Sequence, residues 1–226
     1  MVALELCGIR FEWRSNRFCE VYFRIDDIIN RRQDMRHETT PDKLTESIIE
    51  LGKKLKMNVE PVYIPVVPAQ GCLINECFPN VESMVQQHGG RQINGWSIWQ
   101  WANIMVEAEA HSVWENPEGQ LVDITPHASG ETKILFLKDD NMVYNDNPIP
   151  NVRMALTKSE LVAEYIALMN EKDRIMCESP GKVYSIPRNM QNRMIEIQRM
   201  FNLEVKHYEP CPCGSGLKYK KCCGKE

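Results

Sequence analysis

Cys77, His111 and Asp123 are the residues of this chain whose types and order best suit nucleophilic chemistry. Cys77 stands directly before a predicted helix with Pro79 at its start, and the unpaired N–H groups and dipole of a helix N-terminus favour a thiolate there. A thiolate attacks a carbonyl carbon when a base controls its proton and a third group orients the base. The sequence therefore predicts Cys77 as nucleophile, His111 as base and Asp123 as the orienting group.

A predicted hairpin brings the base and the orienting group together. Residues 105–114 and 121–125 have the composition of strands, and the turn Asn116-Pro117-Glu118-Gly119 joins them. If the hairpin is centred near Pro117, position 111 lies opposite position 123, and directly opposed residues share a face with Cβ atoms about 4.5–5.5 Å apart. The carboxylate can then hold one nitrogen of the imidazole while the other nitrogen faces the thiol.

Acyl transfer also needs donors for the negative charge that develops on the carbonyl oxygen. We predict the backbone N–H of Cys77 and the side chain of Gln70, in QGCLINEC, for this role. Two substitutions within the triad stay open at this point: Cys72 as the nucleophile and His127 as the base.

A metal site is a further alternative, because alternation along the predicted strand places Glu107, Glu109 and His111 on one face. Tryptophans on the same strands, Trp96, Trp99, Trp101 and Trp114, are expected either to pack in the core or to line a groove beside Cys77.

The stretch GGRQINGW followed by EAHSVWENPEGQLVDITP resembles the transglutaminase-like branch of the papain-like fold. That resemblance implies an acyl-enzyme mechanism with Cys77 as nucleophile, His111 as base and Asp123 as orienting group. The chain is also similar to arylamine N-acetyltransferases, which share the triad order and a Cys-Phe start like Cys77-Phe78. An acyltransferase is therefore an alternative to a hydrolase.

The elements that must position these residues follow an α+β pattern. We expect helices at 19–32, 40–57, 80–87, 158–176 and 190–203, and strands at 59–67, 92–101, 105–114, 121–125 and 133–138. The strand at 59–67 contains two prolines and therefore suits the edge of a sheet. We also expect a hairpin between 133–138 and 141–144, and a loop at 146–152. Together with these elements, the resemblance to the transglutaminase-like branch implies a papain-like, transglutaminase-type core in which the cysteine-bearing helix packs on an antiparallel sheet.

The chain ends in CPCGSGLKYKKCCG, which places Cys211, Cys213, Cys222 and Cys223 in a C-x-C-x8-C-C pattern. Four thiolates in a segment too short to bury a core are the expected ligands of a closed, tetrahedral, structural Zn²⁺ site. The segment resembles the SEC-C motif, the zinc-binding tail of the preprotein translocase ATPase SecA. Because that tail contacts the chaperone SecB, the resemblance implies a docking module, and its lysines favour an acidic protein or a nucleic acid as partner.

Composition is that of an ordinary globular chain: 226 residues, 43% hydrophobic and 26% charged, with a net charge of −4. The absence of a signal pattern or a long apolar run predicts a cytoplasmic protein without membrane insertion, in which nine cysteines are thiols or ligands rather than disulfides. We expect four regions: a mostly helical segment at 1–57, the core at 58–150, its helical extension at 151–205 and the zinc-binding tail at 206–226.

The functional prediction is a cysteine-dependent hydrolase acting on an amide, thioester or isopeptide bond of an unknown protein or peptide substrate. The competing class is a non-enzymatic zinc-binding adaptor, in which the core is a binding platform and the tail recruits a chaperone, a ribosome or a nucleic acid.

Overall fold

The computed structural model describes residues 38–101, 103–179, 184–203, 217, 218 and 221. The helix predicted at 19–32 and the four cysteines of the predicted zinc site, Cys211, Cys213, Cys222 and Cys223, lie outside the described residues.

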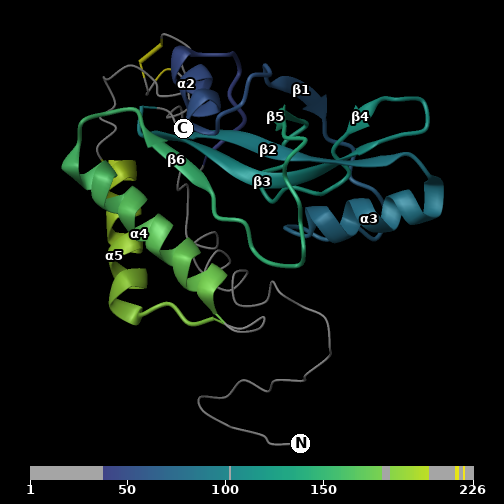
Figure 1. Ribbon diagram of the computed structural model, residues 1–226. Helices are drawn as coiled ribbons and strands as arrows, with labels where there is room; N and C mark the ends of the chain where they lie inside the picture. Colours follow the sequence, from purple (N-terminus) through teal and green to yellow (C-terminus); the bar gives the residue numbers. More distant parts are fainter. Residues whose placement is uncertain (1–37, 102, 180–183, 204–216, 219–220, 222–226) are drawn as a thin grey trace, which may run out of the picture. The chain divides into compact units, whose positions relative to one another are not determined.

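An antiparallel sheet of six strands forms the centre of the described chain (Figure 1). Its neighbours run in the order β1-β5-β2-β3-β4, and β6 pairs with the end of β3 opposite to β4. The strands are β1 (Val62–Pro65), β2 (Arg91–Trp101), β3 (Met105–Glu115), β4 (Leu121–Val122), β5 (Lys133–Lys138) and β6 (Val152–Ala155). The α+β class with an antiparallel sheet is thereby confirmed, as is the edge position of the proline-containing strand.

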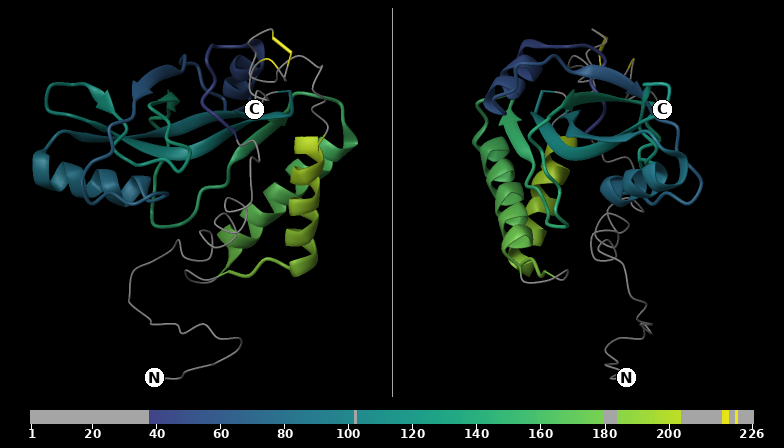
Figure 2. Two further views of the ribbon diagram at one scale, coloured as in Figure 1. Left: turned by 180° about the vertical axis from the view of Figure 1, so that it is seen from behind. Right: turned by 45° about the vertical axis from the view of Figure 1, so that its right-hand side comes forward.

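Helices cover both faces of this sheet. Helix α2 (Glu46–Lys54) buries Ile48 and Leu51 against Trp96, Ile98 and Ala108. The opposite face carries Trp101 and Met105, because side chains alternate along a strand. These two pack with residues of α4 (Glu160–Glu178) and α5 (Arg188–Leu203). Figure 2 shows α2 on one side of the sheet and the α4–α5 pair on the other, together with α3 (Cys77–His88).

Two sequence predictions about helix and hairpin limits are wrong. The helix expected at 40–57 begins only at Glu46, because the residues before it extend the sheet: Thr39 bridges Gln100, and the Thr40 hydroxyl donates to the Lys133 carbonyl at 3.0 Å. Residues 141–144 form no strand with β5, which pairs with β1 and β2 instead. Asp139 closes a turn there, since its Oδ1 accepts the N–H of Asn141 at 3.0 Å.

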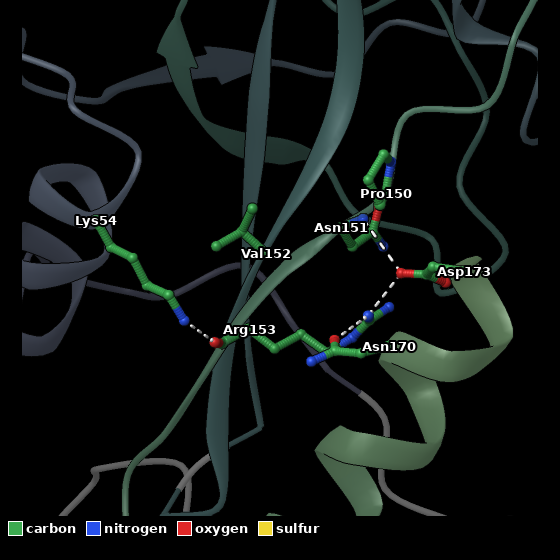
Figure 3. Close-up of a pocket in the computed structure, with 7 residues that line it drawn as sticks. All are labelled: Lys54, Pro150, Asn151, Val152, Arg153, Asn170 and Asp173. Atoms are coloured by element: carbon green, nitrogen blue, oxygen red, sulfur yellow. Dashed lines mark hydrogen bonds and ion pairs between the residues drawn. The ribbon is translucent and has the colours of Figure 1, made fainter. Parts of the chain in front are cut away.

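Strand β6 was not predicted from the sequence, and only its first residue, Val152, fell in the loop expected at 146–152. This strand contributes Arg153 to a buried ionic centre. The Arg153 guanidinium contacts Glu107 Oε1 at 3.0 Å and Asp173 Oδ2 at 2.6 Å, and its side chain is only 1% exposed. Asn170 accepts a further hydrogen bond from Arg153 at 3.0 Å. Arg153 therefore connects β6 to β3 through Glu107. It also connects β6 to α4 through Asp173, as Figure 3 shows.

Replacing Arg153 tests this connection. Arg153→Met leaves two buried carboxylates without their countercharge, and breaking a buried pair from one side costs about 3–5 kcal/mol. We expect that loss in the free energy of unfolding, measured by urea denaturation. Arg193→Met is the matched control, because Arg193 joins Glu164 of α4 from a side chain that is 36% exposed, and exposed pairs contribute below about 1 kcal/mol. Equal losses in the two variants would contradict a structural role for Arg153.

Candidate thiol and imidazole site

Helix α3 begins with Cys77 itself, three residues earlier than predicted, so that Pro79 lies inside the first turn. The helix start is fixed from several sides. Asn80 donates to the Leu73 carbonyl at 2.8 Å and to Thr125 Oγ1 at 3.2 Å, and the ring of Phe78 stacks on Tyr144 with centroids 4.0 Å apart. Cys77 is thereby held at the N-terminus of a helix with only 8% of its surface exposed.

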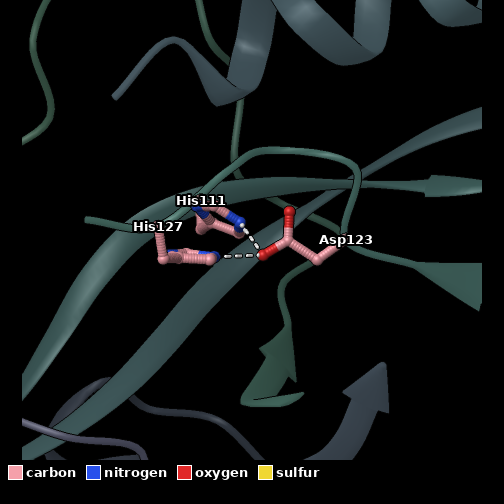
Figure 4. A group of neighbouring side chains, drawn as sticks. All are labelled: His111, Asp123 and His127. Carbon is pink, nitrogen blue, oxygen red and sulfur yellow. Dashed lines mark hydrogen bonds and ion pairs between the residues drawn. The ribbon is translucent and has the colours of Figure 1, made fainter. Parts of the chain in front are cut away.

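Asp123 is fully buried and accepts three hydrogen bonds. Its Oδ2 lies 3.0 Å from His111 Nε2 and 2.7 Å from His127 Nε2, while its Oδ1 accepts the backbone N–H of Thr125 at 3.0 Å. Figure 4 shows both imidazoles directed at the same carboxylate oxygen. The pairing of His111 with Asp123 that the sequence predicted is therefore present in the structure.

The register that produces this pairing differs from the predicted one. Strand β4 places Val122 opposite Trp114 and Leu121 opposite Glu115, so the hairpin is centred on position 118 instead of 117. The Asn116 N–H bonds the Gln120 carbonyl at 2.9 Å and closes a loop that is one residue further along than expected. Moving the hairpin centre by one residue places position 125, instead of 123, opposite His111. Because positions 123 and 125 share a face of the strand, His111 and Asp123 still meet as diagonal neighbours.

The pKa of His111 depends on both Cys77 and Asp123. Burial alone lowers the pKa of His111, but the charges of Cys77 and Asp123 and the hydrogen bonds to both raise that pKa well above its usual value. The pKa of Asp123 behaves in the opposite way: burial raises it, and His111 and His127 together hold it well below the usual range. Since Nε2 of His111 bonds to Asp123, Nδ1 is the nitrogen that remains for Cys77.

His127 is a member of this cluster that the sequence suggested only as a substitute for His111. It follows Asp123 by four residues in DITPH, and its side chain is 12% exposed. Its ring lies edge-on to that of Trp99, with ring centroids 5.4 Å apart. The two imidazole centroids are 5.8 Å apart. His127 thus accompanies His111 at the carboxylate and does not replace it.

Gln70 and Cys72 lie in the segment that precedes α3. The backbone of this segment approaches Asp123, because the N–H of Ala69 bonds the Ile124 carbonyl at 3.0 Å. The Gln70 side chain is exposed, and its role as an oxyanion donor stays a prediction. Burial raises the pKa of the Cys72 thiol, a hydrogen bond with Ala69 opposes that rise, and the charge of Asp123 adds to it. Cys72 is therefore poorly suited to form a thiolate.

The acidic residues proposed as metal ligands with His111 have other partners. Glu107 bonds Arg153, and Glu109 Oε2 accepts the indole N–H of Trp99 at 2.7 Å. Within the described residues, the cluster suited to an ion contains His111, Asp123 and His127 instead. The four tryptophans have different environments. Trp96 and Trp101 are core residues, and the indole of Trp114 donates to the Gly89 carbonyl. Trp99 borders the cluster, because its ring contacts that of His127.

Comparison with known proteins finds similarity at the C-terminus. The family model described as the SEC-C motif matches residues 209–225. The protein translocase subunit SecA of Aliarcobacter butzleri is 73% identical over 22 residues, which are 10% of this chain and 2% of that protein. SecA of Dehalococcoides mccartyi is 77% identical over a stretch of the same 22-residue length, again 10% of this chain and 2% of SecA. The tail resemblance predicted from the cysteine pattern is confirmed.

A longer alignment joins the chain to SecA of Geotalea uraniireducens, which is 35% identical over 74 residues, or 32% of this chain and 8% of that protein. The chain therefore spans less than a tenth of the length of these curated relatives. No solved structure matches it. Within the described residues, no helix combines the length and the apolar character needed to cross a membrane.

Asp123→Asn tests the electrostatic coupling of the cluster. The pKa of His111 should fall, because the carboxylate charge and its hydrogen bond help to raise it. In the parent protein, protonated His111 stabilises the fold fully below its unfolded pKa of about 6.5, and this stabilisation disappears as the pH rises through the raised folded-state pKa. The variant should lose part of that pH dependence.

The measurement is a titration of the imidazole nitrogens by ¹⁵N NMR in protein without added metal. Asp140→Asn is the control, since Asp140 pairs with Lys138 and its side chain is 79% exposed. Because Cys77 also raises the pKa of His111, a partial fall is expected; a pKa that Asp123→Asn leaves unchanged would show that Asp123 does not contribute to it.

Proposed function

We propose that the chain is a cysteine-dependent hydrolase that works through an acyl-enzyme, with a papain-like, transglutaminase-type core. The observation that carries the proposal is the convergence of three elements on one buried site: Cys77 at the start of α3, His111 on β3, and Asp123 just after β4. The order of nucleophile, base and orienting group, and the contact of Asp123 with Nε2 of His111, support it.

The reaction follows from these positions. The Cys77 thiolate attacks the carbonyl carbon of an amide, thioester or isopeptide, and the imidazolium of His111 gives its proton to the leaving group as the carbon–heteroatom bond breaks. Water then attacks the thioester carbonyl, His111 takes a proton from that water, and the acid leaves with Cys77 restored. Asp123 keeps the ring oriented and compensates its positive charge in both steps.

The helix start supplies donors for the oxyanion. Asn80 is already bonded within the helix, since its N–H reaches the Glu76 carbonyl at 2.9 Å. The N–H groups of Cys77 and Phe78 precede it in the first turn, where backbone donors have no partner within the helix. A carbonyl oxygen held at the Cys77 N–H is well placed to develop negative charge. An amine in place of water would make the same site an acyltransferase.

Alkylation of individual cysteines by iodoacetamide, followed by peptide mass spectrometry, tests the proposal. An ordinary thiol with a pKa of about 8.5 is almost wholly protonated at about pH 6. We expect Cys77 to react at that pH about tenfold or more faster than Cys72 and Cys177, because thiolate is the reactive form. His111→Ala should abolish this preference, whereas His88→Ala, at the exposed end of α3, should preserve it.

Ordinary reactivity of Cys77 in parent protein without added metal would refute the hydrolase. The non-enzymatic adaptor would then take its place, since the SEC-C match at 209–225 supports a docking role for the tail independently of the thiol site. Salt-sensitive binding of an acidic protein or a nucleic acid that survives Cys77→Ala distinguishes the adaptor.

For the tail we propose one structural Zn²⁺ held by Cys211, Cys213, Cys222 and Cys223. Four cysteines within the matched SEC-C segment provide the donor set that a closed tetrahedral zinc site requires. The site has no open position for a substrate, so the ion would organise the segment and leave acyl chemistry to the core.

Zinc analysis of the dialysed protein tests the tail. We expect the parent to hold about one more zinc per chain than a variant in which all four tail cysteines become serine, because each thiolate is a ligand. The double variant Cys72→Ser, Cys177→Ser is the control and should keep the metal. Equal zinc contents in the parent and the tail variant would contradict the assignment.

A further inference from the structure

The cluster around Asp123 contains one more imidazole than a thiol triad uses. His111 and His127 approach the same oxygen of one carboxylate through the same ring nitrogen, at 3.0 and 2.7 Å. For catalysis by Cys77, a single imidazole bonded to Asp123 is sufficient. The arrangement of two imidazoles and one carboxylate is, however, a common ligand set for divalent first-row metal ions.

We infer that His111, Asp123 and His127 form a second metal site, which takes a divalent ion such as Zn²⁺ and withdraws His111 from the thiol. None of these three ligands belongs to the matched SEC-C segment at 209–225. The part that concerns Cys77 rests on the proposed hydrolase function, whereas the binding of the ion does not.

The distances suit this ligand set. The three donor atoms lie within 4.8 Å of one another. Zinc bonds of about 2.0–2.1 Å in a tetrahedron place neighbouring ligand atoms roughly 3.3 Å apart, so the hydrogen-bonded contacts need to open by only some tenths of an ångström. The fourth position is left for water.

His127 is the least buried of the three ligands. Asp123 is fully buried and the His111 side chain is 6% exposed, whereas the His127 side chain is 12% exposed. His127 also lies outside β3 and β4, in the segment after Thr125. An ion from solvent therefore reaches His127 first. Removing His127 also changes the positions of Cys77 and His111 less than removing another ligand would.

Binding of the ion changes the protons of both rings. Each Nε2 must present its lone pair to the metal, so the proton that it donated to Asp123 moves to Nδ1 or leaves to solvent. His111 then has its proton on the nitrogen that faces Cys77 and can no longer accept one there. The Nδ1 proton of a neutral, metal-bound imidazole is also a weaker acid than that of an imidazolium, and its transfer to a leaving group is slow. The metal-bound site is thus an inactive form of the thiol site.

Calorimetric titration of the full chain with Zn²⁺, after its tail has been loaded with zinc, tests the inference. We expect one further equivalent in the parent protein and an affinity lower by at least about tenfold in His127→Gln. His88→Gln makes the same substitution at an exposed histidine and should bind like the parent. Cys77→Ala should also retain the ion. Failure to take up a further equivalent, or equal affinity in His127→Gln, would overturn the site.

Co²⁺ absorption identifies the ligands, because zinc in the tail is spectroscopically silent and is held by thiolates that prefer it to cobalt. We expect d–d bands from the second site without a thiolate-to-metal charge-transfer band. Such a band would show Cys77 or Cys72 in the ligand set and would overturn the assignment.

Alkylation of Cys77 separates this inference from the proposed function. Added Zn²⁺ should slow the reaction of Cys77 at least about tenfold in the parent and in His88→Gln, but not in His127→Gln. If the ion binds as expected while Cys77 was never selectively reactive in metal-free protein, the hydrolase is wrong and the metal site stands. If Cys77 is selectively reactive and Zn²⁺ leaves its rate unchanged, the coupling of metal and thiol is wrong.

Discussion

The buried carboxylate of Asp123 is the constraint on which the site depends. An ionised group without solvent is costly unless hydrogen bonds and opposite charge compensate it, and here a backbone N–H and two imidazoles do so. The backbone of the same residue is held as well, since its N–H bonds the Pro65 carbonyl at 3.0 Å and its carbonyl accepts the N–H of Val67 at 2.8 Å. Both imidazoles are consequently oriented by a group that cannot move on its own.

Strand β3 joins this site to the second buried ionic centre. His111 and Glu107 lie four positions apart on it and therefore face the same side of the sheet. Between them, Glu109 accepts the indole proton of Trp99, which in turn packs against His127. Arg153 fixes one end of this row by tying Glu107 to α4. The rigidity of the imidazole cluster is thus connected to the packing of the helical pair through side chains of a single strand.

The sequence predicted the strands of this site better than the contacts between them. Strands β2, β3 and β5 were predicted to within a residue at each end, because aliphatic and aromatic residues are concentrated there between clear turns. The centre of the hairpin was predicted one residue too early, because the residue types of the turn do not determine which two residues form the closing hydrogen bond. His111 and Asp123 still met because a shift of the partner by two positions preserves the face.

Other features depend on partners that are far away in the chain. The alternating Glu107 and Glu109 suggested metal ligands, yet their partners are Arg153, on a strand that the sequence did not predict, and an indole on β2. Thr40 has the residue type of a helix cap and is used by the sheet through Lys133, 93 positions away. In the sequence, His127 is only a histidine four residues after an aspartate, which is a weak indication of a contact. The path of the chain after β4 brings its ring back to the carboxylate of Asp123.

The tail and the core give separate lines of argument about function. The SEC-C match lies at 209–225, whereas the thiol, the imidazoles and the carboxylate lie between positions 77 and 127, so the likeness to SecA tails carries no information about what the core does. What the core does is indicated by the chemistry of its own residues. A thiol at a helix start, with one imidazole between it and a buried carboxylate, suits acyl transfer. A second imidazole on that carboxylate has no place in acyl transfer, and a metal ion is the ligand that would use all three side chains at once.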